Sequence, residues 1–366
     1  MTRESFYERQ TALTAAKIEI YRKYLEGYLP KLLMQFGTCL IADLFCGAGK
    51  NGDKNGSPLV LIDRAKYILS SSHLKEKQIQ ILFNDQDSSN IQNLEEELKK
   101  NEFGNNIQII KILNDKFEVL LPQIIKKYKN DNIPKFFFLD PFTYANVTIE
   151  HLKQLLSLPH TEVLLFLPIF HSYRFSSDQK MSGKNKTRIF VEQFTTRGIT
   201  DYKDIDDFMD SVKEKLLSEL SLDYVRHVLL DGGVSKNSLF LLTKHQAGML
   251  LMNKIAIKMS EDGSRINVET QDQSSIFGIE VTTKFEDFKQ SLTIKLKSKK
   301  EMTNYEIVDF TIKNEFLPKH GKKVIEELFG QKMIKIYDVD KNEIRNRSRW
   351  NIAEKMTKKR IFIWEA

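Results

Sequence analysis

A buried strand that runs directly into a glycine-rich turn and then into a helix constrains the fold more than any other feature. Cys39–Phe45 is an apolar run typical of a strand, and the turn after it reads CGAGKNG. A helix is predicted from Ser57, which is followed by proline, to about Leu69. Strand, glycine turn and helix in this order are typical of a doubly wound α/β sheet.

Strands and helices continue to alternate after this unit, and an amphipathic helix over 10–35 precedes it. Further strands are predicted over residues 79–83, 107–113, 136–139, 162–167 and 238–243. Because such alternation builds parallel sheets covered by helices, we expect a mainly parallel sheet with helices on both faces. The interval 170–228, with a predicted helix over 204–219, is expected to be an inserted helical segment that recognises substrate.

The chain changes character near residue 290. Helices are predicted over 303–313 and 318–330, followed by a strand over 333–339 and a tight turn over 338–342. This order is typical of a winged helix-turn-helix, with a generic α+β cap as the alternative. We therefore expect a domain over residues 1–260, a connecting segment over 261–302 and a small domain over 303–366.

Positive charge is concentrated at the C-terminal end. Lys and Arg balance Asp and Glu at 38 each over residues 1–290, whereas residues 291–366 carry 18 basic and 11 acidic residues. A localised basic surface is expected of a nucleic-acid-binding module, although a solvated lysine-rich face gives the same count. The candidate contacts on the second predicted helix are Lys319, His320, Lys322 and Lys323.

Composition excludes several other classes of protein. The two cysteines, Cys39 and Cys46, lie too far apart along an extended segment to pair, and no histidine is spaced to complete a metal site with them. No apolar run is long enough to span a bilayer, and the N-terminus is polar. We expect no metal, no membrane contact and a cytoplasmic protein.

Four candidate binding residues follow or end the first strand. In doubly wound sheets, ligands bind at the carboxyl ends of the strands, where Asp43, Phe45, Gly47 and Gly49 are predicted to lie. Glycine permits close backbone approach and positive φ, and a carboxylate can accept from a ligand ammonium. The turn alone is a weak indicator, and the full dinucleotide fingerprint G-x-G-x-x-G is not met in a helix context.

Acidic residues also follow the second and third strands. Asp85 is placed to accept hydrogen bonds from two ribose hydroxyls, with Asp87 as the competing candidate and helix capping as the alternative role of Asp87. Asp115 is placed to meet an adenine amino group, unless it is only a turn residue.

Asp140, Pro141 and Phe142 follow the fourth strand and are the candidate catalytic residues. A carboxylate and the proline carbonyl can hold an exocyclic amine, while the aromatic ring stacks on its base. Methyl transfer to such an amine needs orientation of the nitrogen and no covalent nucleophile. The alternative is a helix-capping Asp with Phe142 in the core.

Several stretches resemble the three-Cys-motif partner proteins, namely DLFCGAG from Asp43, GSPL from Gly56, FNDQD from Phe83, FLDPFTY from Phe138 and TKHQAG from Thr243. The resemblance extends over most of the chain. It implies a Rossmann-like methyltransferase fold, S-adenosylmethionine as cofactor at Asp43, Gly47, Gly49 and Asp85, and an active site at Asp140, Pro141 and Phe142. It also implies a partner that is a three-cysteine, radical-SAM-like protein. Where the family commonly has glycine, this chain has Thr143.

Two functional hypotheses follow. The first is an S-adenosylmethionine-dependent methyltransferase that acts on an amino group of a nucleic-acid base. The second is a non-catalytic module that binds nucleic acid or substrate for its three-cysteine partner, which the Thr143 departure favours. A nicotinamide oxidoreductase is a weaker third hypothesis, because the sequence lacks a full fingerprint.

Overall fold

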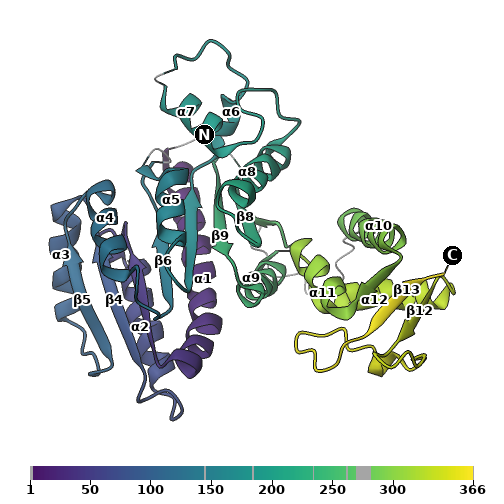
Figure 1. Cartoon of the computed structure of the whole chain (residues 1–366). Helices are drawn as coiled ribbons and strands as arrows, with labels where there is room; N and C mark the ends of the chain where they lie inside the picture. Colours follow the sequence, from purple (N-terminus) through teal and green to yellow (C-terminus); the bar gives the residue numbers. More distant parts are fainter. Residues whose placement is uncertain are drawn as a thin grey trace. The chain divides into compact units, whose positions relative to one another are not determined.

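The computed structural model describes the chain in several stretches, and side chains are placed from residue 12 onward and from residue 284 in the last stretch. The described residues are 3–143, 146–183, 185–233, 235–260, 263–268 and 282–365. The chain divides into two compact units (Figure 1), with the boundary inside helix α9 (Gln246–Met259). The first contains residues 1–251 and 264–271, and the second contains residues 252–263 and 272–366.

An eight-stranded sheet forms the centre of the first unit, in the order β10-β8-β9-β7-β6-β1-β4-β5. Its strands are β1 (Thr38–Asp43), β4 (Gln78–Asn84), β5 (Ile107–Leu113), β6 (Lys135–Leu139), β7 (Thr161–Leu167), β8 (Tyr224–Gly232), β9 (Ser235–Thr243) and β10 (Arg265–Asn267). All pairs are parallel except those that β9 makes with β7 and β8. The prediction of a mostly parallel α/β sheet is therefore confirmed.

The strand order reverses between β1 and β6. From β1 the chain proceeds to β4 and β5 on one side, and then returns to place β6 and β7 on the other. The carboxyl ends of β1 and β6 consequently meet at a topological switch point, which is where open α/β sheets bind ligands.

Helices cover both faces of this sheet. They are α1 (Arg3–Phe36), α2 (Ser57–Leu69), α3 (Ser88–Lys99), α4 (Phe117–Tyr128) and α5 (Ile149–Leu156). The alternation along β6 separates the faces: Phe136 and Phe138 stack against Tyr24 and Tyr21 of α1. Their neighbours Phe137 and Leu139 join the core cluster formed with α4 and α5. Both faces are buried, which explains the unbroken apolar run of β6.

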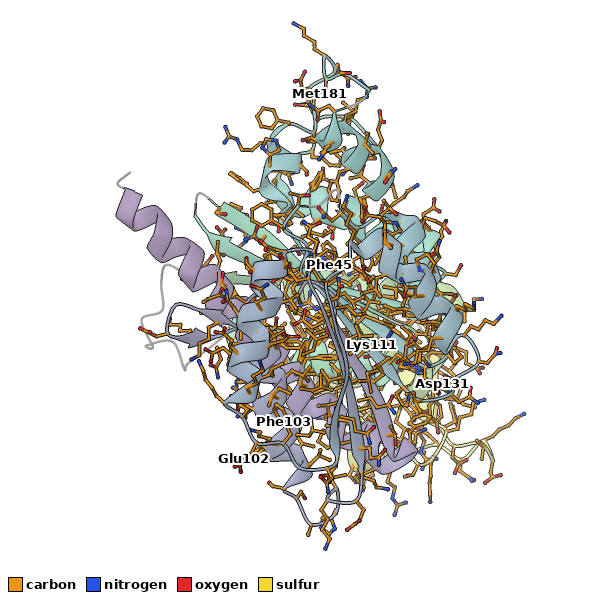
Figure 2. The ribbon with its side chains drawn as sticks, turned by 90° about the vertical axis from the view of Figure 1, so that its left-hand side faces the viewer. Phe45, Glu102, Phe103, Lys111, Asp131 and Met181 are labelled. Carbon is orange, nitrogen blue, oxygen red and sulfur yellow. The ribbon has the colours of Figure 1, made fainter. Side chains whose placement is uncertain are left out.

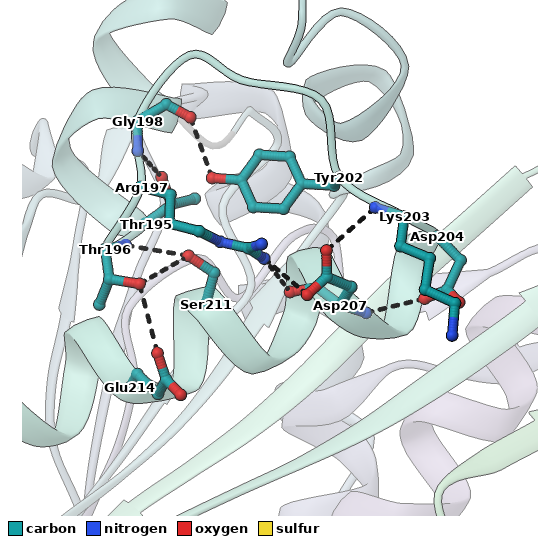
Figure 3. A network of polar contacts seen from close by, with 10 residues as sticks. All are labelled: Thr195, Thr196, Arg197, Gly198, Tyr202, Lys203, Asp204, Asp207, Ser211 and Glu214. Atoms are coloured by element: carbon teal, nitrogen blue, oxygen red, sulfur yellow. Dashed lines mark hydrogen bonds and ion pairs between the residues drawn. The ribbon is translucent and has the colours of Figure 1, made fainter.

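The segment after β7 contains α6 (Phe170–Arg174), α7 (Lys186–Phe194) and α8 (Ile205–Glu219). Its polar network (Figure 3) joins the residue 195–204 loop to α8, where Arg197 binds the Asp207 carboxylate at 2.7 Å and lies over the Tyr202 ring. Met181 marks an outer turn of this segment in Figure 2. The expected interval of 170–228 also includes the first part of β8, whose residues pair with β9.

The second unit has its own core and a three-stranded antiparallel sheet in the order β11-β13-β12. Its elements are α10 (Thr282–Lys299), β11 (Glu301–Thr303), α11 (Asn304–Lys313), α12 (Pro318–Gly330), β12 (Ile334–Tyr337) and β13 (Ile361–Trp364). The stretch 261–302, expected as a connection, thus contains β10, α10 and β11, and residues 261–262 and 269–281 lie outside the described residues. In the part of the chain that is described, no helix is long and apolar enough to cross a membrane.

Candidate functional site

Asp43 is the last residue of β1 and is fully buried on the face covered by α1. It pairs in register with Phe138, two residues before Asp140, so the two predicted site residues reach the same edge of the sheet. Neither Asp43 carboxylate oxygen forms a hydrogen bond of good geometry within the described residues. A buried carboxylate without such a partner is uncommon and costs stability unless a ligand or water satisfies it.

Burial raises the pKa of Asp43 to about 7. The nearby Ser57 hydroxyl and Phe45 amide lower this pKa, the negative charge of Asp140 raises it, and Lys17 lowers it. Asp43 therefore changes charge near neutral pH, at the position where the sequence predicts contact with a cofactor.

The glycine turn lies directly after this carboxylate. Gly47 and Gly49 have φ angles of 63° and 84°, and a Cβ added at Gly47 would meet no atom within 4 Å. The left-handed backbone favours glycine at both positions, and the space beside Gly47 is open. Phe45, labelled in Figure 2, is half-buried with its ring 5.2 Å from that of Phe117.

Asp85 holds this turn in place. One carboxylate oxygen accepts from the Gly47 amide at 2.9 Å, and the other accepts from the Asp87 amide and the Asn90 side chain. Asp87 caps α3 by accepting from the Ser89 amide, which is the capping role considered for it in the sequence. A carboxylate offers about four acceptor positions, so Asp85 keeps capacity for one further donor.

Asn84 connects the ends of three strands. Its side-chain amide donates to the carbonyls of Leu44 and Asp115 and accepts from the Asp115 amide. These hydrogen bonds hold the backbone of Asp115 next to the end of β4. The Asp115 side chain is half-exposed. Asn84 was not predicted as a site residue, because an Asn at a strand end is typical of an ordinary turn.

Asp140 is paired with Lys17 from α1. The Lys17 ammonium lies 2.5 Å from an Asp140 carboxylate oxygen and 4.3 Å from the centre of the Phe166 ring. Lys17 is buried, with a relative exposure of 8%, whereas the Asp140 side chain is 21% exposed. A cation thus already occupies one acceptor of the predicted catalytic carboxylate.

The two residues after Asp140 differ sharply in exposure. Pro141 is buried, whereas Phe142 is 93% exposed, so Phe142 does not belong to the core. The hydroxyl of Thr143 hydrogen-bonds the Asn146 side chain across the turn. The Thr143 side chain is therefore hydrogen-bonded to a side chain three positions along the chain.

A small polar hollow of about 100 Å³ lies among these residues. Its lining includes Lys17, Phe45, Gly47, Gly49, Ser57 and Asp140. The structure therefore brings together residues from α1, the glycine turn, α2 and the end of β6. Lys17, like Asn84, was not predicted from the sequence, and its indicator is a lysine at the spacing of the buried residues Leu13, Tyr21 and Tyr24.

The predicted nucleic-acid contacts on α12 have unequal surroundings. Lys319 and Lys323 are exposed, while Lys322 faces Glu326 at 4.0 Å. Burial, followed by the charges of Lys319 and Lys323, lowers the pKa of His320 to about 4. His320 is thus neutral at pH 7, and its ring nitrogen accepts from the Leu317 amide at the start of the helix.

Comparisons with known proteins add distant structural likenesses. The methyltransferase domain of bacterial CtHen1-CN is 14% identical with a TM-score of 0.32, over 61% of this chain and 99% of that chain. A candidate methyltransferase from Thermoplasma acidophilum is 11% identical with a TM-score of 0.24, over 56% of this chain and 66% of that chain. No model of a known protein family and no curated protein matches the sequence.

Proposed function

We propose that this protein is an S-adenosylmethionine-dependent methyltransferase that acts on an exocyclic amino group of a nucleic-acid base. The observation that carries the proposal is the meeting of Asp43 and Asp140 at the switch point of the sheet, beside a glycine turn. The Asp43 carboxylate is buried without a hydrogen bond of good geometry within the described residues, and the ring of Phe142, two residues after Asp140, is exposed.

The residues present fit the amino-acid end of the cofactor. Asp43 offers a buried acceptor for an ammonium, and the open side of Gly47 lets backbone amides approach a ligand. Asp85 retains an acceptor for a ribose hydroxyl and Asp115 lies at the neighbouring strand end. The hollow of about 100 Å³ is smaller than a nucleoside, so the ribose and adenine belong outside it, toward Asp85 and Asp115.

The chain's own residues would act on the target base by orienting it. The Asp140 carboxylate and the Pro141 carbonyl accept hydrogen bonds from the amine, and Phe142 stacks on the base. When bound, the cofactor would supply an electrophilic sulfonium methyl group to this nitrogen, and the proton that the nitrogen releases would pass to solvent. Lys17 pairs with one Asp140 carboxylate oxygen, so the target amine would use the acceptor positions of this carboxylate that Lys17 leaves open.

The topology of the second unit supports the nucleic-acid part of the proposal. The order α10, β11, α11, α12, β12, β13, with β13 between β11 and β12, is one that a winged helix would have and supports this class. We propose that the second unit belongs to this class, with the segment between β12 and β13 in the place of the wing.

The test is calorimetric titration of the full chain with S-adenosylmethionine and S-adenosylhomocysteine. We expect binding by the wild type and about 5- to 100-fold weaker binding by Asp43→Asn and Asp85→Asn, because each removes a charged acceptor. Asp87→Asn is the matched control, since Asp87 caps α3 and is assigned no ligand contact. Absence of binding by the wild type would sink the cofactor assignment and leave the non-catalytic hypothesis.

Catalysis is tested separately with radiolabelled methyl groups and mixed DNA and RNA. Asp140→Asn should abolish transfer while cofactor affinity changes less than about twofold, because Asp140 orients the amine and not the cofactor. Retention of full transfer by this variant would refute the role of Asp140. Cofactor binding without transfer to any nucleic acid would refute the proposed substrate.

A further inference from the structure

The segment between β12 and β13 carries an unusual density of positive charge. Residues 345–360 contain seven Lys and Arg residues and one acidic residue, Glu354. Glu354 is paired with Lys254, and Arg345 is paired with Glu343. The remaining six basic residues make no ion pair within the described residues: Arg347, Arg349, Lys355, Lys358, Lys359 and Arg360.

Buried anchors hold this segment against the second unit. Trp350 is fully buried with its ring edge-on to Phe329, and Ile344 and Ile352 are buried on either side of it. Arg345, Arg347 and Arg349 lie on the exposed stretch between the anchors Ile344 and Trp350, so packing holds both ends of this stretch.

Hydrogen bonds from α11 add a second constraint. The fully buried Asn304 donates to the carbonyls of Asn351 and Lys358 and accepts from the Arg360 amide, all at 2.9 to 3.0 Å. The Arg360 side chain in turn donates to the carbonyls of Arg349 and Lys359. The guanidinium is thus held in place by neutral groups and forms no ion pair within the described residues, although its charge, after the hydrogen bonds from Asn342, helps to lower the pKa of Asp338.

Residues of the segment between β12 and β13 line a polar hollow of about 670 Å³. Four basic side chains line it, from Arg345, Arg349, Lys358 and Arg360, together with Asn and Ser side chains. Planar guanidinium groups and amides suit the oxygens of phosphodiesters, and a hollow of this size accommodates more than one phosphate. Its two acidic members, Asp338 and Glu343, accept hydrogen bonds from Asn342 and Arg345.

We propose that this hollow and its basic rim, the 338–360 surface, bind the phosphate backbone of a nucleic acid and supply most of the affinity of the second unit. A membrane fits less well, because Ile344, Trp350 and Ile352 are buried and cannot insert, which leaves Val339 as the one exposed large apolar residue among the described residues of this surface. On α12, by contrast, His320 is neutral and Lys322 faces a carboxylate. The inference rests on the proposed nucleic-acid target and moves its main contact from α12 to this surface.

The test measures the fluorescence anisotropy of labelled single- and double-stranded DNA and RNA with the full chain, in the absence of S-adenosylmethionine. The test variant is Arg345→Gln, Arg349→Gln, Lys358→Gln. The matched control removes the same charge from α12 of the same unit by Lys319→Gln, Lys322→Gln, Lys323→Gln. Each protein is titrated between roughly 50 and 200 mM salt.

We expect the test variant to bind about tenfold or more weakly, and the slope of log affinity against log salt to fall by about two to three, since each lost phosphate contact removes about one. The α12 control should remain within about twofold of the wild type. Equal weakening by both variants, or weakening by the control alone, would overturn the assignment. If the triple variant fails to fold, the single variant Arg349→Glu carries the same expectation of weaker binding.

Two further outcomes count against the proposal: no binding of the wild type to any nucleic acid, and tighter binding to phosphatidylserine vesicles or polyglutamate than to nucleic acid. Which labelled strand binds best distinguishes DNA from RNA and single from double strands. Because no cofactor is present, failure of methyl transfer leaves this result unaffected, and failure here leaves the cofactor assignment intact.

Discussion

Lys17, Asp43 and Asp140 form a group of charges whose members depend on one another. The Lys17 ammonium pairs with Asp140 and also lowers the pKa of Asp43. Replacing Lys17 by Met keeps an apolar chain near Phe166 but leaves two carboxylates facing each other. We expect Lys17→Met to lower the free energy of unfolding by about 1 to 3 kcal/mol at pH 8, because a partly buried charge loses its partner.

The expected loss is smaller at pH 6 than at pH 8, because Asp43, with a pKa of about 7, is then mostly protonated. Chemical unfolding of Lys17→Met, Asp140→Asn and the double variant measures the coupling. The double variant should be more stable than Lys17→Met alone at pH 8. Strictly additive effects would contradict the ion pair as a stabilising contact.

The positions of candidate site residues could be predicted from the sequence where these residues lie at the end of a strand. Asp43, Gly47, Asp85 and Asp140 follow from locating β1, β4 and β6, because parallel strands bring their carboxyl ends to one edge. Lys17 could not be found in this way, since its partner lies 123 residues away and helix periodicity alone does not pair a buried lysine with a particular carboxylate.

At the scale of elements, Glu162 joins three of them. This fully buried carboxylate of β7 accepts from the Tyr24 hydroxyl of α1 and the Thr243 hydroxyl of β9, each at 2.6 Å. Burial raises its pKa to about 7, although the two hydroxyls lower it. In the unfolded chain a Glu ionises near pH 4.3, so between these values the native state binds more protons than the unfolded state.

The stability that Glu162 contributes is therefore complete below about pH 4.3 and is lost as the pH rises through about 7. Relative to Glu162→Gln, which does not titrate, the wild type should lose up to about 1.4 kcal/mol per pH unit across this window. Urea unfolding at several pH values, followed by circular dichroism, measures this loss of stability. Both tryptophans, Trp350 and Trp364, lie in the second unit, so their fluorescence is the internal control and should show no such difference. Parallel pH profiles of the two proteins by circular dichroism would refute the assignment.

Long or fully buried elements were predictable, and short ones were not. β6 and α8 follow from an apolar run and helical spacing, and their observed bounds agree closely with the predicted ranges 136–139 and 204–219. β11 has three residues and is defined by its antiparallel pairing with β13, a contact about 60 positions along the chain. Such strands depend on tertiary pairing and lack enough residues to show a period of two.

At the scale of the whole molecule, the charge distribution separates two kinds of binding. The hollow of the candidate cofactor site is lined by both signs of charge, at Lys17, Lys50 and Asp140, whereas the 338–360 surface has an excess of cations. Phosphate binding by cations weakens steeply with salt through counterion release, while binding of a small ligand in a mixed-charge site depends on salt far less.

We therefore expect raised salt to affect the two steps of the proposed reaction differently. Between roughly 50 and 200 mM salt, the KM for nucleic acid should rise by at least about tenfold, while kcat and the Kd for S-adenosylmethionine change less than about twofold. Steady-state methylation at several salt concentrations, with cofactor titration as a parallel measurement, checks this. A kcat that falls with salt at constant KM would mean that the salt-sensitive contacts act in the chemical step. It would contradict the assignment of cofactor binding to the first unit and of phosphate binding to the second.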